Sequence, residues 1–456
     1  RRRDKMGKSY PLIPKKVPPV ETKYRRIKTE IPVPESIPVL EKLRTYEPVS
    51  MSGQPLVVWD HAEGVNVYDR YGNKWLDFSS GVLVTNAGHS APEVLSEIKK
   101  MIEKPLLHNY CFPSEIRAEL AEKIASVSPE PLKKVFLLTT GAETVECALK
   151  LARTYGKKLN KKVVISYEGS FHGRTLGAQM IGGQPGLKEW IVSPDPYIYH
   201  LPFPGEPRCK DRSFAFFEKR IKELGIKPED VCAVISETYQ GISGALMPVE
   251  YAQKLRKWCD KNGALLIFDE IQAGFGRTGK MFGFLHYGIL PDIFCLGKGI
   301  SSSLPISAVV GRKEYMDLYE PGTMTSTHTG SPLCCAAALG SIKAIEKYNL
   351  VENAEKMGRI FEEELTKIYK EFDCVQFLCG KGLVWGLQIG KKGTETPDPD
   401  TAHQIVGKCV EKGLLLFAPV GLGGGTIKVN PPLIIKEDAV REGCSVIREA
   451  IKEVAG

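Results

Sequence analysis

Two short apolar segments constrain the fold of this chain more than any other feature of its sequence. Residues 264–268 and 293–296 are continuous apolar runs bounded by glycine and polar residues. Runs of this length are typical of strands that are buried on both faces of a parallel sheet. Asp269 ends the first run, and Lys298 follows the second between two glycines. Because open α/β sheets bind ligands at the carboxyl ends of their strands, this pair predicts a functional site at that edge.

Similar apolar segments alternate with helical patterns through the middle of the chain. Further strands are expected at residues 135–138, 163–165, 231–235 and 305–310. Apolar residues at helical spacing, from Val145 to Ala152, follow the first of these strands. The alternation predicts a doubly wound α/β domain with a large, mostly parallel sheet over residues 91–336.

The two ends of the chain predict a smaller α+β domain. Residues 37–90 contain a hairpin pattern near residue 70, and residues 337–456 contain helices, short strands and a closing helix. Residues 1–36 carry six prolines among lysines and arginines, which predicts a basic, extended arm. This arm is expected to be either a solvated tail or a segment that lies across a partner subunit.

Composition excludes several classes of protein. The net charge is +8, and the first thirty residues alone supply a balance of +8, with eleven Lys/Arg against three Asp/Glu. The remaining chain is formally neutral, which argues against a nucleic-acid-binding face. No apolar stretch is long enough for a membrane span, and the chain starts without a signal-peptide pattern. The twelve cysteines show no Cys-x-x-Cys motif and no metal-type spacing with the eight histidines, so we expect reduced thiols, no metal site and a cytoplasmic protein.

The residues at the expected strand ends suit pyridoxal 5'-phosphate. Thr140, Gly141 and Ala142 lie between a strand and a helix, where free N–H groups favour a phosphate, although a plain turn is the alternative. Asp269 can keep a pyridine nitrogen protonated, with a helix cap or surface turn as the alternative. Lys298 can supply the Schiff-base amine, with an exposed, solvated lysine as the alternative. An acid and an amine in these places meet the needs of this cofactor.

Several ordered motifs give residues 45–452 a resemblance to a known family. These motifs are Asn86-Ala87-Gly88-His89, Thr140-Gly141-Ala142-Glu143, Phe171-His172-Gly173-Arg174-Thr175, Glu237 with Gln240-Gly241, Asp269-Glu270-Ile271-Gln272-Ala273-Gly274-Phe275-Gly276-Arg277-Thr278-Gly279, Gly297-Lys298-Gly299 and Pro431-Pro432-Leu433. In this order they resemble those of the class III aminotransferases, which are fold-type I pyridoxal-phosphate enzymes such as ornithine, 4-aminobutyrate and other ω-amino acid transaminases.

The resemblance implies roles for single residues around the cofactor. Lys298 would form the Schiff base and move the proton between the substrate carbon and the cofactor, and Asp269 would pair with the ring nitrogen. The remaining contacts implied are the phosphate (Gly141 and Ala142), the two ring faces (Phe171 and Ile271), the ring hydroxyl (Gln272), and the cofactor site more generally (Glu237). Thr327 matches a residue that reaches the phosphate from the other subunit, which implies a homodimer with a shared active site.

Four positions bear on the substrate. Arg174 matches a ligand of the substrate carboxylate, which suits a guanidinium. Many glutamate-using relatives carry a Glu after Gln-Gly and an Arg before Pro-Pro, where this chain has Ile242 and Lys428. An isoleucine cannot neutralise a cation, so the usual switch between two substrates is absent, and Lys428 either binds a carboxylate or points away. Val82 stands where an aromatic residue selects ornithine in that subfamily, which argues against ornithine.

These observations predict transamination from an ω-amino acid or related primary amine to a 2-oxo acid, either pyruvate or 2-oxoglutarate. The enzyme would be a homodimer, with a dimer of dimers as an alternative. A racemase, decarboxylase, aminomutase or phospho-lyase with the same cofactor and fold is the enzymatic alternative, because the reaction depends on substrate geometry around the ring. A non-catalytic scaffold whose basic arm binds a partner is the alternative from another class, and the presence of Lys298, Asp269 and Arg174 argues against it.

Overall fold

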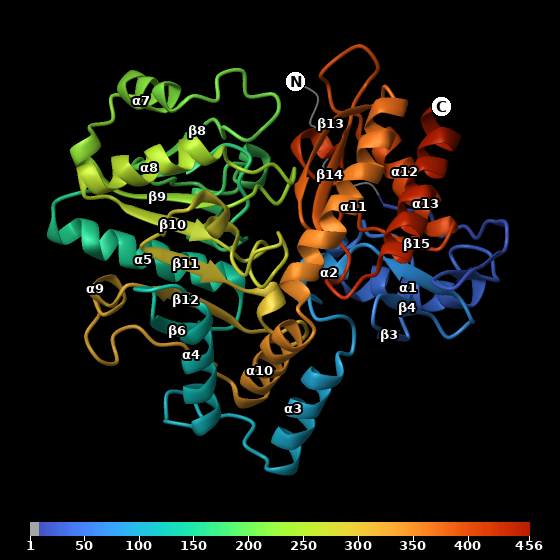
Figure 1. Ribbon diagram of the computed structural model, residues 1–456, viewed down its shortest axis with the longest axis horizontal. Helices are drawn as coiled ribbons and strands as arrows, with labels where there is room; N and C mark the ends of the chain where they lie inside the picture. Colours follow the sequence, from blue (N-terminus) through green and yellow to red (C-terminus); the bar gives the residue numbers. More distant parts are fainter. Residues whose placement is uncertain (1–8) are drawn as a thin grey trace. The chain divides into compact units, whose positions relative to one another are not determined.

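The computed structural model describes residues 9–456, which form two compact units (Figure 1). The first unit contains the chain up to Ala91, the tripeptide Ile242–Gly244 and residues Asn353–Gly456. The second unit contains Pro92–Gly241 and Ala245–Glu352. Each unit has its own sheets and its own buried core.

A seven-stranded sheet forms the centre of the second unit. Its strands, in spatial order, are β6 (Lys134–Leu138), β12 (Ser307–Gly311), β11 (Ile293–Leu296), β10 (Leu265–Asp269), β9 (Val231–Glu237), β7 (Val163–Tyr167) and β8 (Ile198–Leu201). β12 runs antiparallel to both of its neighbours, and the other pairs are parallel. Every residue of β9, β10 and β11 is buried, which explains their continuous apolar sequences. The predicted α/β fold is confirmed.

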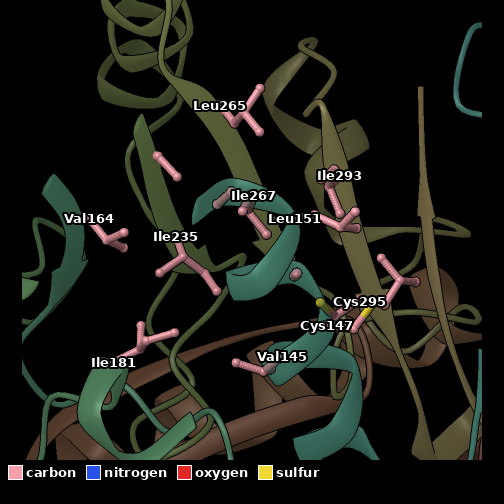
Figure 2. Close-up of a cluster of buried hydrophobic side chains, with 14 of the residues drawn as sticks. Val145, Cys147, Leu151, Val164, Ile181, Ile235, Leu265, Ile267, Ile293 and Cys295 are labelled. Carbon is pink, nitrogen blue, oxygen red and sulfur yellow. The ribbon is translucent and has the colours of Figure 1, made fainter. Parts of the chain in front are cut away.

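The helices of this unit pack against the sheet or against one another. They are α3 (Pro92–Glu103), α4 (Glu115–Val127), α5 (Gly141–Lys158), α6 (Leu176–Ile181), α7 (Phe214–Glu223), α8 (Val249–Asn262), α9 (Lys313–Met316) and α10 (Pro332–Lys347). Figure 2 shows Val145 and Leu151 of α5 in one cluster with Ile235 and Ile267 of the sheet. Each such buried aliphatic side chain contributes roughly 1.5–3 kcal/mol to folding. This packing fixes α5, and hence its first turn, against the strands.

Two sheets form the first unit. One has the order β1 (Val20–Glu21), β2 (Arg26–Ile27), β5 (Lys74–Asp77), β4 (Asn66–Tyr68) and β3 (His61–Glu63), with β15 (Leu414–Leu415) beside β5. The other is antiparallel, with β13 (Val375–Lys381), β14 (Val384–Ile389) and β16 (Thr426–Val429). The longer helices are α1 (Ile37–Tyr46), α11 (Leu350–Glu371, which enters this unit at Asn353), α12 (Pro399–Glu411) and α13 (Glu437–Ala455). β4 and β5 pair in antiparallel fashion, which confirms the predicted hairpin.

The basic arm folds onto the first unit. Ile27, Ile31 and Val33 are buried in a core cluster of this unit. Arg25 Nε forms an ion pair of 2.6 Å with Glu442 of α13. The interpretation of the arm as a solvated tail is therefore wrong for this segment, because its apolar residues outweigh its charges and prolines in deciding where it lies. Residues 1–8 lie outside the described chain.

A left-handed turn, α2 (Ser80–Leu83), follows β5 in the first unit. Its φ angles are 50° at Ser80, 55° at Gly81, 65° at Val82 and 62° at Leu83. A left-handed helical conformation costs about 1–2 kcal/mol for each residue other than glycine. Three of these four residues carry that cost, so other contacts must hold the turn.

Three further features of the described residues concern cysteines, metal ions and membrane-spanning helices. All twelve cysteines are free. Residues 9–456 contain no group of three or more His, Cys, Asp or Glu side chains arranged to hold a metal ion. Within the same part of the chain, no helix combines the length and the apolar character that crossing a membrane requires.

Candidate active site

A cavity of about 150 Å³ lies in the second unit at the carboxyl ends of β9 and β10 and the loop after β11. It is lined by Gly141, Ala142, Phe171, His172, Gly173, Glu237, Tyr239, Asp269, Ile271, Gln272 and Lys298. Within the described chain, the lining includes every predicted cofactor residue except Thr140 and Thr327. Residues from segments far apart in the sequence meet here because the parallel strands all end at this edge.

Asp269 is the last residue of β10 and is only 5% exposed. Its Oδ1 accepts a hydrogen bond of 3.0 Å from the backbone N–H of Ile271, and its Oδ2 lies 2.8 Å from Nδ1 of His172. This burial contradicts the alternative of a surface turn. Both carboxylate oxygens of Asp269 therefore have a partner, and the side chain lines the cavity.

His172 is a cavity residue to which the sequence alone assigned no role. Within residues 9–456 its buried Nε2 has no hydrogen-bond partner. Burial alone would lower the pKa of His172, but the hydrogen bond and negative charge of Asp269, aided by Glu237, raise it above its ordinary value. The signal that could have found it is its place in the motif directly after Phe171, one of the predicted stacking residues.

Lys298 begins the short turn η6 (Lys298–Ile300) directly after β11 and is partly buried. Its φ is 45°, a left-handed value that is unusual outside glycine and that recurs at functional sites. Burial lowers the pKa of the Lys298 amine, and the charges of Asp269 and Glu237 oppose that shift only in part. The alternative of an exposed, solvated lysine is therefore wrong, and the amine is closer to its neutral, nucleophilic form.

Glu237 ends β9 and fixes the loop that carries Phe171. One carboxylate oxygen accepts a hydrogen bond of 3.1 Å from the Phe171 N–H, and the other accepts one of 2.9 Å from the Gly241 N–H. Burial raises the pKa of Glu237 to about 7, against the opposing charge of His172. The Phe171 ring is thus held through its own backbone at one side of the cavity.

The first turn of α5 forms another wall of the cavity. Thr140 caps this helix together with Glu143 in a reciprocal capping box, an arrangement that contributes about 1 kcal/mol. The N–H groups of the first residues of a helix have no partner within the helix and attract anions. A side chain at Gly141 would place its Cβ only 2.9 Å from Cδ1 of Ile271, so the Ile271 side chain would have to shift.

These features fit pyridoxal phosphate. The cavity offers a helix N-terminus for a phosphate, a carboxylate for a ring nitrogen and an amine of lowered pKa for an aldehyde. The unpaired Nε2 of His172 marks the same cavity as incomplete in its hydrogen bonding. The donor set is that of an organic phosphate cofactor with an ionisable ring.

Five other predicted residues lie elsewhere. Arg174 is exposed, with its guanidinium carbon 5.7 Å from the centre of the Phe171 ring. Thr327 is exposed in the second unit. Val82, Ile242 and Lys428 belong to the first unit, with exposed fractions of 43%, 7% and 1%.

Known proteins resemble this chain in both sequence and fold. The profile of the family described as Aminotransferase class-III matches residues 49–451. A 5-aminovalerate aminotransferase of Pseudomonas putida is 34% identical, covering 87% of this chain and 93% of its own length. A leucine/methionine racemase of Thermococcus litoralis is 32% identical, covering 90% and 92% respectively.

Among solved structures, the ornithine aminotransferase of Toxoplasma gondii superposes with a TM-score of 0.81 at 27% identity, covering 91% of this chain and 94% of that one. The family match spans both units and all the motifs on which the resemblance depends. This chain belongs to the class III aminotransferases, and it is a pyridoxal-phosphate-dependent enzyme of transamination.

Proposed function

We propose that this enzyme transfers an amino group from an ω-amino acid to a 2-oxo acid, either pyruvate or 2-oxoglutarate. The observation that carries the proposal is the meeting of Asp269 and Lys298 in one cavity of a class III aminotransferase. The choice of donor is supported by relatives whose names specify 5-aminovalerate and ornithine as substrates.

Lys298 and Asp269 have the central roles in this proposal. When bound, pyridoxal phosphate supplies an electron sink for negative charge on the substrate carbon. Lys298 is the amine that holds the cofactor and moves the proton at that carbon, which its lowered pKa favours. Asp269 directs its negative charge to the ring nitrogen, and His172 orients Asp269 from its other side.

The remaining cavity residues bind and orient the cofactor. The N–H groups of Gly141 and Ala142, with the Thr140 cap, receive the phosphate. The further proposed contacts are Phe171 and Ile271 on the ring faces, Gln272 at the ring hydroxyl and Glu237 behind Phe171. Together these residues would hold the ring beside the Lys298 amine and orient it for reaction.

Substrate contacts and assembly complete the proposal. Arg174 binds a substrate carboxylate, and Val82, Ile242 and Lys428 shape the substrate pocket. The enzyme is proposed to act as a homodimer, to which the partner's Thr327 contributes a phosphate contact. The exposed apolar side chains of Ile102, Leu107 and Phe112 (58%, 60% and 73% exposed) support such an interface. A cytoplasmic location stays a prediction that rests on the pattern of cysteines.

Replacing the proposed Schiff-base lysine tests the function directly. Lys298→Ala should abolish transamination while pyridoxal phosphate still binds non-covalently, since the phosphate and ring contacts remain. The measurements are multiple-turnover activity and the absorbance of the cofactor before and after borohydride reduction.

Lys188→Ala is the matched control for this experiment. Burial also lowers the pKa of Lys188, but the residue does not line the cavity among the described residues, so this variant should keep its activity. Near-normal turnover by Lys298→Ala would contradict the assignment. Incubation with an amino donor alone separates transamination, which releases one oxo product per site, from racemisation of a chiral amino acid, which releases none.

A further inference from the structure

The left-handed turn Ser80–Leu83 has the hydrogen bonds of a helix but the opposite hand. The Leu83 N–H donates to the Ser79 carbonyl at 3.0 Å, and the Val84 N–H donates to the Ser80 carbonyl at 2.8 Å. All four residues have φ between 50° and 65°. Val82 is the least suited of them to this conformation, because its branched Cβ crowds the backbone.

Val82 gains little packing in return for this strain. Its side chain is 43% exposed, whereas Ser80 and Leu83 on either side are 0% and 2% exposed. The turn is thus anchored at its ends and presents its middle outward. Strain that is not offset by burial of the strained residue itself points to a role outside stability.

Asp77 and His89 hold the entry of the turn. Asp77 is completely buried, and its Oδ1 accepts hydrogen bonds from the N–H and the hydroxyl of Ser79 at 2.7 and 2.6 Å. Its Oδ2 lies 2.7 Å from Nε2 of His89. The Ser79 hydroxyl oxygen in turn accepts a hydrogen bond of 3.1 Å from the N–H of Gly81 inside the turn.

A second set of contacts joins the turn to the segment after β16. The Ser80 hydroxyl donates a hydrogen bond of 2.6 Å to the Asn430 carbonyl, and the Asn430 amide donates one of 3.3 Å to the Ser79 carbonyl. Asn430 is 0% exposed and stands two residues after Lys428. These hydrogen bonds therefore join the backbone segment that carries Val82 to the segment that carries Lys428, within the first unit.

We propose that Asp77, His89 and Ser80 are positioning residues that fix Val82 relative to Lys428 and thereby set the donor chain length that the enzyme accepts. The proposal rests on the proposed function of Val82 and Lys428 as pocket residues. None of the three positioning residues needs to touch the donor, because each acts through the conformation of the turn.

The experiment breaks this network at two points and follows donor selectivity. His89→Leu and Ser80→Ala should raise KM for 4-aminobutyrate or 5-aminovalerate by about tenfold, and should change the ratio of the two KM values in the same direction as Val82→Ala. The conservative His89→Gln retains a donor for the carboxylate and should restore the ratio. Cofactor absorbance should stay unchanged in all of these variants.

The chain offers two closely matched controls in the same unit. His61→Leu removes an exposed histidine whose Nδ1 lies 3.0 Å from the Asp60 carboxylate. Ser90→Ala removes a hydroxyl that, like that of Ser80, belongs to a residue of positive φ (51°) and donates to a backbone carbonyl, that of Ala62, at 2.7 Å. Both controls should keep the wild-type ratio of KM values.

Hydrogen exchange of the apoenzyme supplies a readout that needs no substrate. Amide exchange in the peptide covering residues 79–86 should be faster in His89→Leu and Ser80→Ala than in the two controls. Unchanged exchange in both variants would overturn the proposal, as would an unchanged KM ratio in an active enzyme. Failure of the unmodified enzyme to convert either donor would instead count against the proposed function and, with it, against a role in donor length. Exchange would still show whether Ser80 and His89 hold the turn.

Discussion

Each unit of the molecule contains a buried histidine–aspartate pair, and the two pairs differ in what surrounds them. In the second unit, His172 lies 2.8 Å from Asp269, and in the first unit His89 lies 2.7 Å from Asp77. All four side chains are at most 6% exposed. The distance and the burial of the two pairs are thus nearly the same, although His172 contacts its aspartate through Nδ1 and His89 through Nε2.

The two pairs differ in the hydrogen bonds to the other carboxylate oxygen of each aspartate and in what surrounds the pair. Asp269 receives one backbone N–H, and both members of its pair line a cavity that fits a cofactor. Asp77 receives two hydrogen bonds from Ser79 and sits behind a strained turn. We infer that the same chemical pair controls charge in one unit and backbone shape in the other, so its presence in a sequence does not by itself indicate catalysis.

Exchanging each aspartate for asparagine is the strongest way to break this comparison. Asp269→Asn should lower kcat by about 10²–10³-fold, because the ring nitrogen loses its negative partner in a buried site. Asp77→Asn keeps an acceptor for Ser79, so it should leave kcat nearly unchanged and act mainly on the KM of the donor. Steady-state kinetics with saturating cofactor measure both effects. Equal losses of kcat in the two variants would show that the pairs do not differ in role.

The pH dependence of the free energy of unfolding tests the charge on the His172–Asp269 pair of the second unit. Because the folded-state pKa of His172 is raised above its ordinary value of 6.5, the folded protein binds the extra proton more tightly than the unfolded chain. This contribution is complete below pH 6.5 and is lost as the pH rises through the folded pKa. The free energy of unfolding of the apoenzyme should therefore decrease with rising pH in this range.

His172→Gln should flatten this decrease, since glutamine does not titrate. Glu237 acts in the same direction at lower pH, because its folded pKa of about 7 exceeds the ordinary value of 4.5, so stability is lost as the pH rises between these values. Urea unfolding between about pH 7 and about pH 9 isolates the histidine from most of the glutamate effect, which lies below the Glu237 folded pKa of about 7. A slope in His172→Gln as steep as that of the unmodified protein would contradict the proposed charge on His172.

The second unit was predicted well because its signals are local. Continuous apolar runs ending in Asp269 and in Gly297-Lys298 identify buried strands and the polar residues at their ends without any long-range information. The sequence assigned no role to His172 because that role depends on Asp269, 97 residues away. Its place directly after Phe171 is a local signal, but it does not reveal this contact.

The first unit was harder to predict for the same reason. The stretch Ser80-Gly81-Val82-Leu83 contains one glycine, and nothing in it predicts four left-handed residues in succession. The hand of the turn depends on contacts such as Ser80 with Asn430, 350 residues further along the chain. The solvated-tail alternative for the arm failed for a similar reason, since the core that buries Ile27 is completed by residues as distant as Val410 and Leu415.

Substituting glycine at Val82 is expected to give the smallest effect. It tests whether the left-handed backbone at Val82 is strained, as the proposed role of the first unit requires. Glycine tolerates φ of 65°, whereas alanine does not, so Val82→Gly should be more stable than Val82→Ala by roughly 0.5–1 kcal/mol after the entropy of the unfolded chain is counted. Val84, two residues on, has φ of −96°, and there glycine should be the less stable by a similar amount of roughly 0.5–1 kcal/mol. Chemical denaturation of the four variants measures these differences. If the two positions gave the same order of glycine and alanine, the turn would not store strain at Val82, and the network around Asp77 would have nothing to hold in place.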